Sequence, residues 1–250
     1  MKVVLLSLFA LLFISDAEKH LNGVYLLKSF KYGDATEWGS DNRRKVVKVF
    51  KDGYWMCVYF DDHRPNRKLF GGACGGTFEI IDGKYVEGHD FYSWDSTHVG
   101  QSTKMDYRVD EKGFEQYGKI NSNKYRDYQI VEKFERIESK VTLKDPTLEG
   151  VWVLKERYVK GVKEKIEGQY LRIIQYPIIA MAHYDLAKKA YYGATLHEYQ
   201  FDRNVLSEKC EANSDDSTQV GNVLSSQVSI KGNRLTQKRN NQVEIFQKLK

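Results

Sequence analysis

A short stretch that occurs twice constrains the fold of this chain most strongly. Residues 21–28 read LNGVYLLK and residues 148–155 read LEGVWVLK, so both share the pattern Leu-x-Gly-Val-aromatic. Each copy opens a long series of short segments rich in β-branched and aromatic residues. Self-similarity of this kind is the sequence signature of a repeated structural unit. We therefore expect two modules within the 250 residues rather than one large domain.

The segments after each copy have the composition of strands joined by tight turns. Asp52-Gly53, for example, separates two apolar runs in the manner of a β-hairpin. The segments in the first half are residues 23–30, 44–50, 54–60, 70–81, 85–92, 102–109, 114–120 and 126–137, and those in the second half are 150–157, 170–174, 178–185, 195–201, 204–210, 223–230, 234–237 and 243–249. Eight antiparallel strands in a meander close naturally into a barrel. We predict an all-β chain of two consecutive eight-stranded antiparallel up-and-down barrels, in which only residues 187–190 could form a single helical turn.

The first residues have the features of a secretory signal peptide. Lys2 precedes an apolar run of about a dozen residues, and Ser15-Asp16-Ala17 supplies small residues for cleavage. The run is shorter than the roughly 20 residues that a membrane-spanning helix needs. We expect a signal peptide at 1–17, a first barrel at 18–138, a linker at 139–147 and a second barrel at 148–250. The expected location is secreted or periplasmic, without a membrane span.

Composition and charge narrow the classes of partner. Apolar residues make up 41% of the chain and aromatic residues 13%, which is sufficient for buried cores. The formal charge of +5 is spread along the sequence and does not form the basic stripe of a nucleic-acid-binding protein. We expect no nucleic-acid partner, and the oligomeric state is left open.

Three cysteines leave an odd thiol for an oxidising compartment. Cys57 and Cys74 flank a loop and could form a disulfide across a hairpin. The alternative is that both, together with Cys210, are small buried hydrophobic side chains.

Polar side chains offer only a weak case for catalysis. His89, Asp90, Asp95 and His98 lie close together, but His and carboxylate ligands at this spacing have no second pair and no cysteine to complete a zinc site. No Gly-x-Ser-x-Gly motif is present for a serine nucleophile. We predict no metal and no cofactor, and we favour a protein without enzymatic activity.

Aromatic residues are the stronger signal in the first half. Alternation along a strand places Trp55 and Tyr59 on one face. The side chains that we expect to line a barrel cavity are Trp55, Tyr59, Phe91, Tyr107 and Tyr117. Such walls suit an apolar or ring-bearing ligand. The alternative is that these rings simply fill the barrel.

The two opening motifs resemble the Gly-x-Trp start of the calycins, the lipocalin superfamily. The chain is similar to tandem lipocalin-like domains of secreted bacterial proteins of unassigned function. The resemblance implies a glycine and an aromatic ring at each barrel floor, here Gly23 with Tyr25 and Gly150 with Trp152. It also implies that a late basic residue closes that floor over the ring. Arg136 and Lys248 occupy matching places, each two residues after a phenylalanine.

The resemblance further implies that such a protein holds a small molecule. Our first hypothesis is a secreted, non-enzymatic binding protein with a small hydrophobic or aromatic ligand in a barrel cavity. The second is a small-molecule-modifying enzyme that uses His89, Asp90 and His98 at the barrel rim. The third is an interaction module whose barrels are filled.

Overall fold

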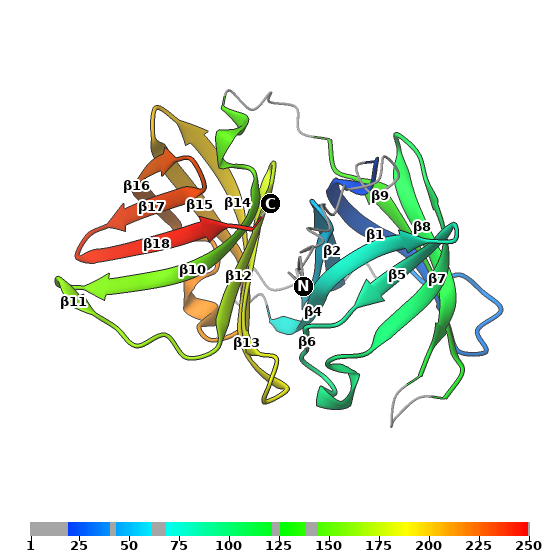
Figure 1. The fold of residues 1–250 in the computed structure, drawn as a ribbon. Helices are drawn as coiled ribbons and strands as arrows, with labels where there is room; N and C mark the ends of the chain where they lie inside the picture. Colours follow the sequence, from blue (N-terminus) through cyan, green and yellow to red (C-terminus); the bar gives the residue numbers. More distant parts are fainter. Residues whose placement is uncertain (1–19, 41–43, 62–68, 122–125, 139–144, 250) are drawn as a thin grey trace, which may run out of the picture.

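The computed structural model describes residues 20–40, 44–61, 69–121, 126–138 and 145–249. Two sheets form within them, one from each half of the chain, and every strand pairing is antiparallel. In the first sheet the pairing of β3 with β4 closes the ring, and in the second the pairing of β10 with β18 does so. The prediction of two consecutive eight-stranded up-and-down barrels is confirmed (Figure 1). The expected signal peptide and most of the expected linker lie outside the described residues.

Each barrel is a meander of neighbouring strands with one additional two-residue strand. The strands of the first barrel are β1 (Gly23–Tyr32), β2 (Arg44–Lys51), β3 (Tyr54–Asp61), β4 (Phe70–Ile81), β5 (Lys84–Gly88), β6 (Phe91–Tyr92), β7 (Ser102–Val109), β8 (Gly113–Ile120) and β9 (Tyr128–Arg136). The strands of the second barrel are β10 (Gly150–Val159), β11 (Val162–Lys163), β12 (Gln169–Gln175), β13 (Ile178–Asp185), β14 (Ala190–Asp202), β15 (Val205–Asn213), β16 (Val223–Lys231), β17 (Arg234–Arg239) and β18 (Gln242–Lys248). The short strands β6 and β11 attach to β4 and β10.

The structure differs from the sequence-based expectation in three local features. The segment expected as one strand at 85–92 is interrupted, and its last two residues form β6, which pairs with Cys74 and Gly75 of β4. Residues 186–189 form a hairpin turn between β13 and β14 instead of a helical turn. Three 3-10 turns also occur, η1 (Ser96–His98), η2 (Pro146–Leu148) and η3 (Ser217–Gln219), each capped by the carboxylate of the preceding aspartate.

Each barrel has an apolar core of its own. In the first, the ring of Phe50 packs edge-on against Tyr25 and Phe78 at centroid distances of 5.6 and 5.1 Å. In the second, Trp152 and Phe246 are buried in the corresponding place. Inward-facing residues alternate with outward-facing ones along the strands, as a barrel requires.

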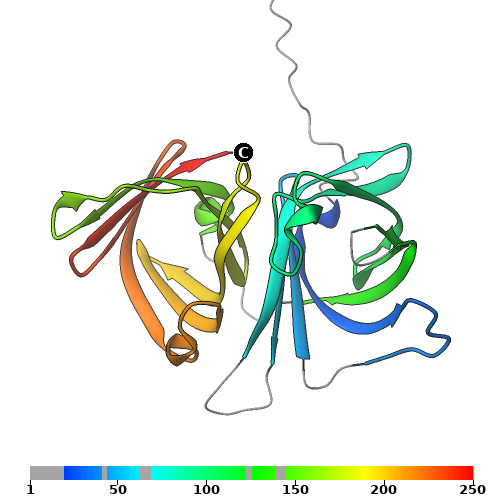
Figure 2. The ribbon, with the colours of Figure 1, turned by 90° about the horizontal axis from the view of Figure 1, so that it is seen from below.

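A third apolar cluster joins the two barrels. On β2, Val46 faces the first barrel's interior, whereas Val47 and Val49 face outward and are also buried. They pack with outward-facing residues of β12, including Leu171 and Ile173, and β3 contacts β14 beside them. Both faces of these strands are therefore covered, which explains why they read as continuous apolar runs. Figure 2 shows the two barrels side by side with β2 and β3 against β12 and β14.

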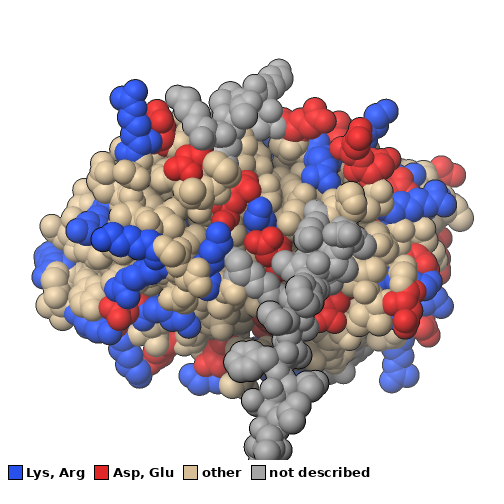
Figure 3. Space-filling model, turned by 45° about the horizontal axis from the view of Figure 1, so that its top comes forward, with Lys and Arg blue, Asp and Glu red and all other residues tan. Residues whose placement is uncertain are grey.

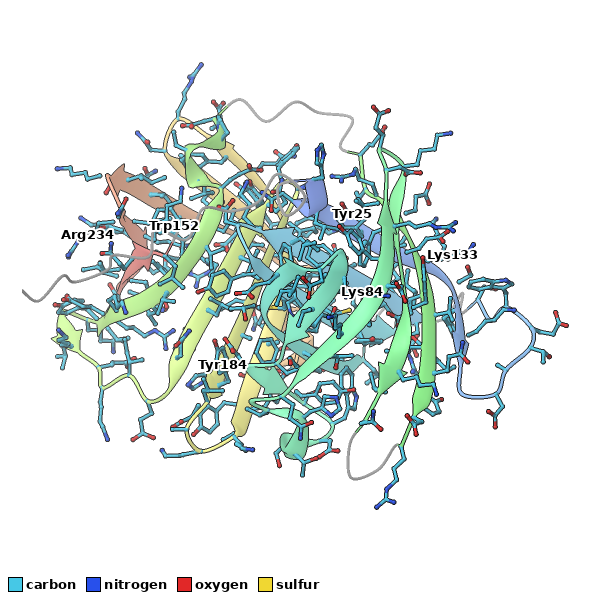
Figure 4. All side chains as sticks on the ribbon, turned by 45° about the vertical axis from the view of Figure 1, so that its right-hand side comes forward. Tyr25, Lys84, Lys133, Trp152, Tyr184 and Arg234 are labelled. Carbon is cyan, nitrogen blue, oxygen red and sulfur yellow. The ribbon has the colours of Figure 1, made fainter. Side chains whose placement is uncertain are left out.

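Polar contacts border this interface. Lys51 Nζ lies 2.9 Å from Glu149 Oε2. The hydroxyl of Tyr184 donates to Asp90 Oδ2 over 3.2 Å, and the Tyr184 ring lies 5.1 Å from that of Phe91. Figure 4 shows Tyr184 at the boundary between the barrels, with Tyr25 inside the first and Trp152 inside the second. On the face shown in Figure 3, basic and acidic side chains are interspersed.

Candidate functional site

One end of the first barrel, here called the floor, is closed around Tyr25. The guanidinium carbon of Arg136 lies 4.8 Å from the centroid of the Tyr25 ring. Its Nη1 donates to the carbonyl of Asn22 over 2.9 Å, and its Nη2 donates to the Tyr25 hydroxyl and, over 3.1 Å, to the carbonyl of His20. A Cβ at Gly23 would lie 2.4 Å from Arg136 Nη1, so glycine leaves the room that the guanidinium occupies. Burial raises the pKa of Tyr25 to about 12, although Arg136 acts in the opposite direction.

The floor of the second barrel has the same design. Lys248 Nζ lies 5.2 Å from the centroid of the Trp152 ring, and the indole N–H of Trp152 donates to the carbonyl of Leu148 over 3.0 Å. In the first barrel the Tyr25 hydroxyl makes the equivalent bond to Leu21. A cation–π contact of this kind contributes about 0.5–2 kcal/mol.

The first barrel contains a cavity of about 320 Å³. It extends from the middle of the barrel to the end opposite the floor, here called the mouth, where Tyr32, Arg44 and Trp94 lie. Aromatic rings form much of its wall. They are those of Tyr32, Trp55, Tyr59, Tyr92, Trp94 and Tyr128.

A chain of buried polar side chains forms the inner end of this cavity. Lys48 is only 2% exposed; it forms an ion pair with Glu87 and donates to Gln116 Oε1 over 2.7 Å. The Gln116 amide donates to Glu132 Oε2 over 2.7 Å, and the hydroxyl of Tyr32 donates to the other oxygen of Glu132. Buried polar groups need such partners because an unpaired one loses its hydration without compensation. The chain is continuous from Glu87 to Tyr32.

Burial and charge set the ionisation of this network. Burial, the largest single influence, lowers the pKa of Lys48, but the negative charges around it, that of Glu87 first and that of Glu132 also, together outweigh burial, so the Lys48 pKa lies above its ordinary value. Burial raises the pKa of Glu132, although Lys48 acts in the opposite direction. Lys48 therefore stays protonated and positively charged, whereas burial opposes the ionisation of Glu132.

The mouth is shaped by the packing of Trp94 on β4. The Trp94 indole N–H donates to the carbonyl of Gly71 over 3.0 Å, and its ring lies 4.9 Å from that of Tyr59. Gly72 has φ of +136° and a Cβ there would lie 2.1 Å from the Trp94 ring. Glycine is thus required where the indole crosses the strand. The glycine-rich part of β4 serves ring packing, and Trp94 remains 46% exposed at the mouth.

Two buried histidines complete the wall. His89 and His98 line the cavity with ring centroids 5.0 Å apart. Burial lowers the pKa of His89 to about 4, partly offset by Glu87, and burial also lowers the pKa of His98. Both are neutral at pH 7. Among the described residues, no group of three His, Cys, Asp or Glu side chains is placed to hold a metal ion.

The similarity to known proteins is confined to solved structures. No protein-family model matches the sequence, and no curated protein is significantly similar to it. A solved lipocalin-like protein from Bacteroides uniformis is 15% identical, with a TM-score of 0.34, and the match covers 41% of this chain and 98% of that one. An uncharacterized protein from Bacteroides eggerthii is 13% identical, with a TM-score of 0.33, covering 40% of this chain and 98% of that one.

Each half of the chain is a closed eight-stranded meander that opens with Gly-x-aromatic, and a late cation covers that aromatic ring. The chain is a tandem of closed eight-stranded antiparallel barrels. Within the described residues no helix is long and apolar enough to cross a membrane.

The first barrel brings together only some of the residues expected at its cavity. Trp55 and Tyr59 line it. Tyr107 lies on the inner face, 6.3 Å from the ring of Tyr85, and packs with the core around it. Tyr117 follows Gln116 on β8 and, by alternation, lies on the other face of the strand. Phe91 faces the second barrel because the chain is interrupted before β6.

The residues of the hypothetical rim enzyme are likewise divided. His89 and His98 face the cavity, whereas the Asp90 carboxylate accepts a hydrogen bond from Tyr184 of the second barrel. The three side chains therefore do not converge on one point. Cys57 and Cys74 lie directly opposite each other on β3 and β4 and both line the cavity as free thiols, so the disulfide left open by the sequence is not formed.

Sequence reasoning missed the polar network, although a signal for it was present. Lys48 interrupts an apolar run, and the matching position of the second half, Arg172, is also a buried cation. Comparing the two halves position by position would have singled out charged residues repeated within apolar strands. Strand alternation alone shows which face they share but not that they meet.

Proposed function

We propose that this is a secreted, non-enzymatic binding protein that holds a small aromatic or hydrophobic molecule in the cavity of its first barrel. The observation that carries the proposal is the cavity itself, about 320 Å³ with largely aromatic walls and a mouth at the barrel end. Small-molecule sites are typically concave, mostly apolar and furnished with a few placed polar groups. The network from Glu87 to Tyr32 supplies such groups at the inner end.

The second barrel has different residues at the positions that match the cavity wall of the first, and this difference supports the proposed binding function. Strand register matches Trp55 with Ile179 and Tyr59 with His183, and the matching η1 and η3 turns align Trp94 with Asp215. At these three matched positions the second barrel therefore has neither a tryptophan nor a tyrosine ring. The framework of floor and core is common to both, so these rings are not needed to build such a barrel.

Binding of an uncharged environment-sensitive dye tests the proposal. Prodan should gain fluorescence with the full-length mature protein, and Trp94→Ala should weaken its binding by about 2- to 10-fold, since an aromatic contact contributes about 0.5–1.5 kcal/mol. Trp38→Ala is a matched control, because Trp38 is 44% exposed in the same barrel but lies outside the cavity wall. Absence of dye binding, or equal effects of the two substitutions, would refute the proposal.

A further inference from the structure

The two barrels carry the same set of buried polar positions. Strand pairing establishes the match, because Lys48 lies opposite Tyr25 just as Arg172 lies opposite Trp152. The matched pairs are Lys48 with Arg172, Glu87 with Glu208, Gln116 with Gln237, and Glu132 with Glu244. The ion pairs that these matched side chains form in the two barrels can therefore be compared directly.

In the second barrel every buried carboxylate of this set has its own cation. Arg172 Nη2 donates to Glu208 Oε1 over 2.9 Å. Arg157 reaches Glu244 Oε1 with Nε at 2.9 Å and Nη2 at 2.8 Å. Two cations thus neutralise two carboxylates.

Within the part of the first barrel that the structure describes, one of the two cations has no counterpart. Lys48 pairs with Glu87, as Arg172 does with Glu208. Glu132 lies opposite Phe30 in the register where Glu244 lies opposite Arg157. Its hydrogen-bond donors, Tyr32 and Gln116, are uncharged, and among the described residues it has no direct ion-pair partner.

The unmatched carboxylate is at the cavity. Glu132 is 5% exposed and lines the cavity wall together with Tyr32 and Gln116. Arg44 also lines the cavity, but it is solvent-exposed at the mouth, opposite Asp61 in the register of β2 and β3. A buried charge without a partner is costly, so a cation that entered the cavity would gain from meeting Glu132.

We propose that the ligand of the first barrel is an aromatic amine whose positively charged nitrogen pairs with Glu132, in the role that Arg157 has toward Glu244. This inference rests on the proposed binding function and specifies the class of ligand. The aromatic wall fits the same class, because rings such as Trp55 and Tyr59 attract a cation at their faces as well as stack with another ring. The cavity thus offers both parts of such a molecule a partner.

Three probes that share an indole ring and differ in charge test the inference. Tryptamine is cationic, tryptophol is neutral and indole-3-acetate is anionic at pH 7. Titration calorimetry with the full-length mature protein should give tryptamine about 10- to 100-fold tighter binding than tryptophol, because a hydrogen bond to a charged group contributes about 1.5–3 kcal/mol. Indole-3-acetate should bind weakest.

Substitution of Glu132 tests whether its carboxylate causes the preference for tryptamine over tryptophol. Glu132→Gln keeps the shape of the side chain and should bring the tryptamine-to-tryptophol ratio close to one. Glu244→Gln removes the matched carboxylate of the second barrel and should leave the ratio unchanged. Phe30→Arg gives the first barrel the cation that the second has, and it should abolish the preference as Glu132→Gln does.

The outcomes separate the inference from the function on which it rests. If tryptophol binds as tightly as tryptamine, or if Glu132→Gln preserves the preference, the amine assignment is wrong while cavity binding stands. If prodan and all three indoles fail to bind, both the binding function and the amine assignment are overturned. A preference that Glu244→Gln abolishes would place the cation in the second barrel and refute the inference.

Discussion

Replacing Lys48 with methionine should destabilise the first barrel strongly. Methionine fits the surrounding rings, which include Trp55 at 4.7 Å from Lys48 Nζ, so the change removes charge with little loss of packing. It leaves the carboxylate of Glu87, 5% exposed, without its ion pair and leaves the Gln116 carbonyl without its donor. Removal of one partner from a buried ion pair costs about 3–5 kcal/mol.

Equilibrium urea unfolding measures this loss, and amide hydrogen exchange assigns it to the first barrel. Lys28→Met is the matched control, because Lys28 pairs with Glu135 at 2.6 Å but both side chains are more than half exposed. Such exposed pairs contribute about 0–1 kcal/mol. A second substitution, Glu87→Gln, added to Lys48→Met should recover part of the stability by removing the unpaired charge.

The loss should also depend on pH. Burial raises the pKa of Glu132 and Lys48 opposes this, so removal of Lys48 should raise that pKa further. A carboxyl whose pKa is raised by folding lowers stability above its unfolded pKa of about 4.3 and ceases to do so as it becomes protonated. The deficit of Lys48→Met should therefore be largest near pH 7 and shrink toward pH 4. A deficit below about 1 kcal/mol at pH 7, or one that does not change with pH, would refute this account of the network.

Three further predictions follow from the floor, the buried histidine and the interface. Arg136→Ala should cost the first barrel about 2–4 kcal/mol, and Lys248→Ala should cost the second about 0.5–2 kcal/mol, because Arg136 adds hydrogen bonds to its contact with Tyr25; equal losses in urea unfolding would argue against it. His89, whose pKa burial lowers to about 4, should supply stability that is complete above pH 6.5 and is lost as the pH falls through about 4, roughly 3 kcal/mol in all. His89→Gln should flatten that part of the stability–pH curve, and an unchanged curve would contradict the burial. Phe91→Ala should cost about 3–5 kcal/mol and separate the unfolding of the two barrels, whereas a single transition with unchanged midpoint would show that the interface does not couple them.

Strand positions could be predicted well because local chemistry determines them. The Asp52-Gly53 turn has both residues at positive φ, as the hairpin requires, and the predicted hairpin of β2 and β3 forms there. The resemblance of the two opening motifs likewise located Tyr25 and Trp152, since each ring lies four residues from the carbonyl to which it donates. These features depend on residues close in sequence or on a repeated motif.

The cavity could be predicted only in part, because it depends on where the chain leaves regular alternation. Tyr85, Glu87, His89 and Phe91 share one face under strict period-two alternation. The first three do face inward, but the interruption before β6 turns Phe91 toward the second barrel. The interface was missed for a related reason. A strand covered on both faces reads as a continuous apolar run, and the run does not reveal that a second barrel provides the cover.

At matched positions, the two barrels have different residues where a substitution has a smaller effect on folding stability, and similar residues where it would have a large effect. The floor and the pair of Lys48 with Glu87, or Arg172 with Glu208, are buried, so altering one partner alone leaves an uncompensated charge. Trp94 is 46% exposed at the mouth, where a substitution costs less stability than in the buried core, and the second barrel has Asp215 in its place. One buried difference does not follow this rule. Glu132 and Glu244 are matching carboxylates, but the residue opposite Glu244 is the cation Arg157, whereas the residue opposite Glu132 is Phe30. A framework selected for stability alone would favour the neutralised arrangement of the second barrel, so the unmatched Glu132 is best explained by a cation that arrives from outside the chain.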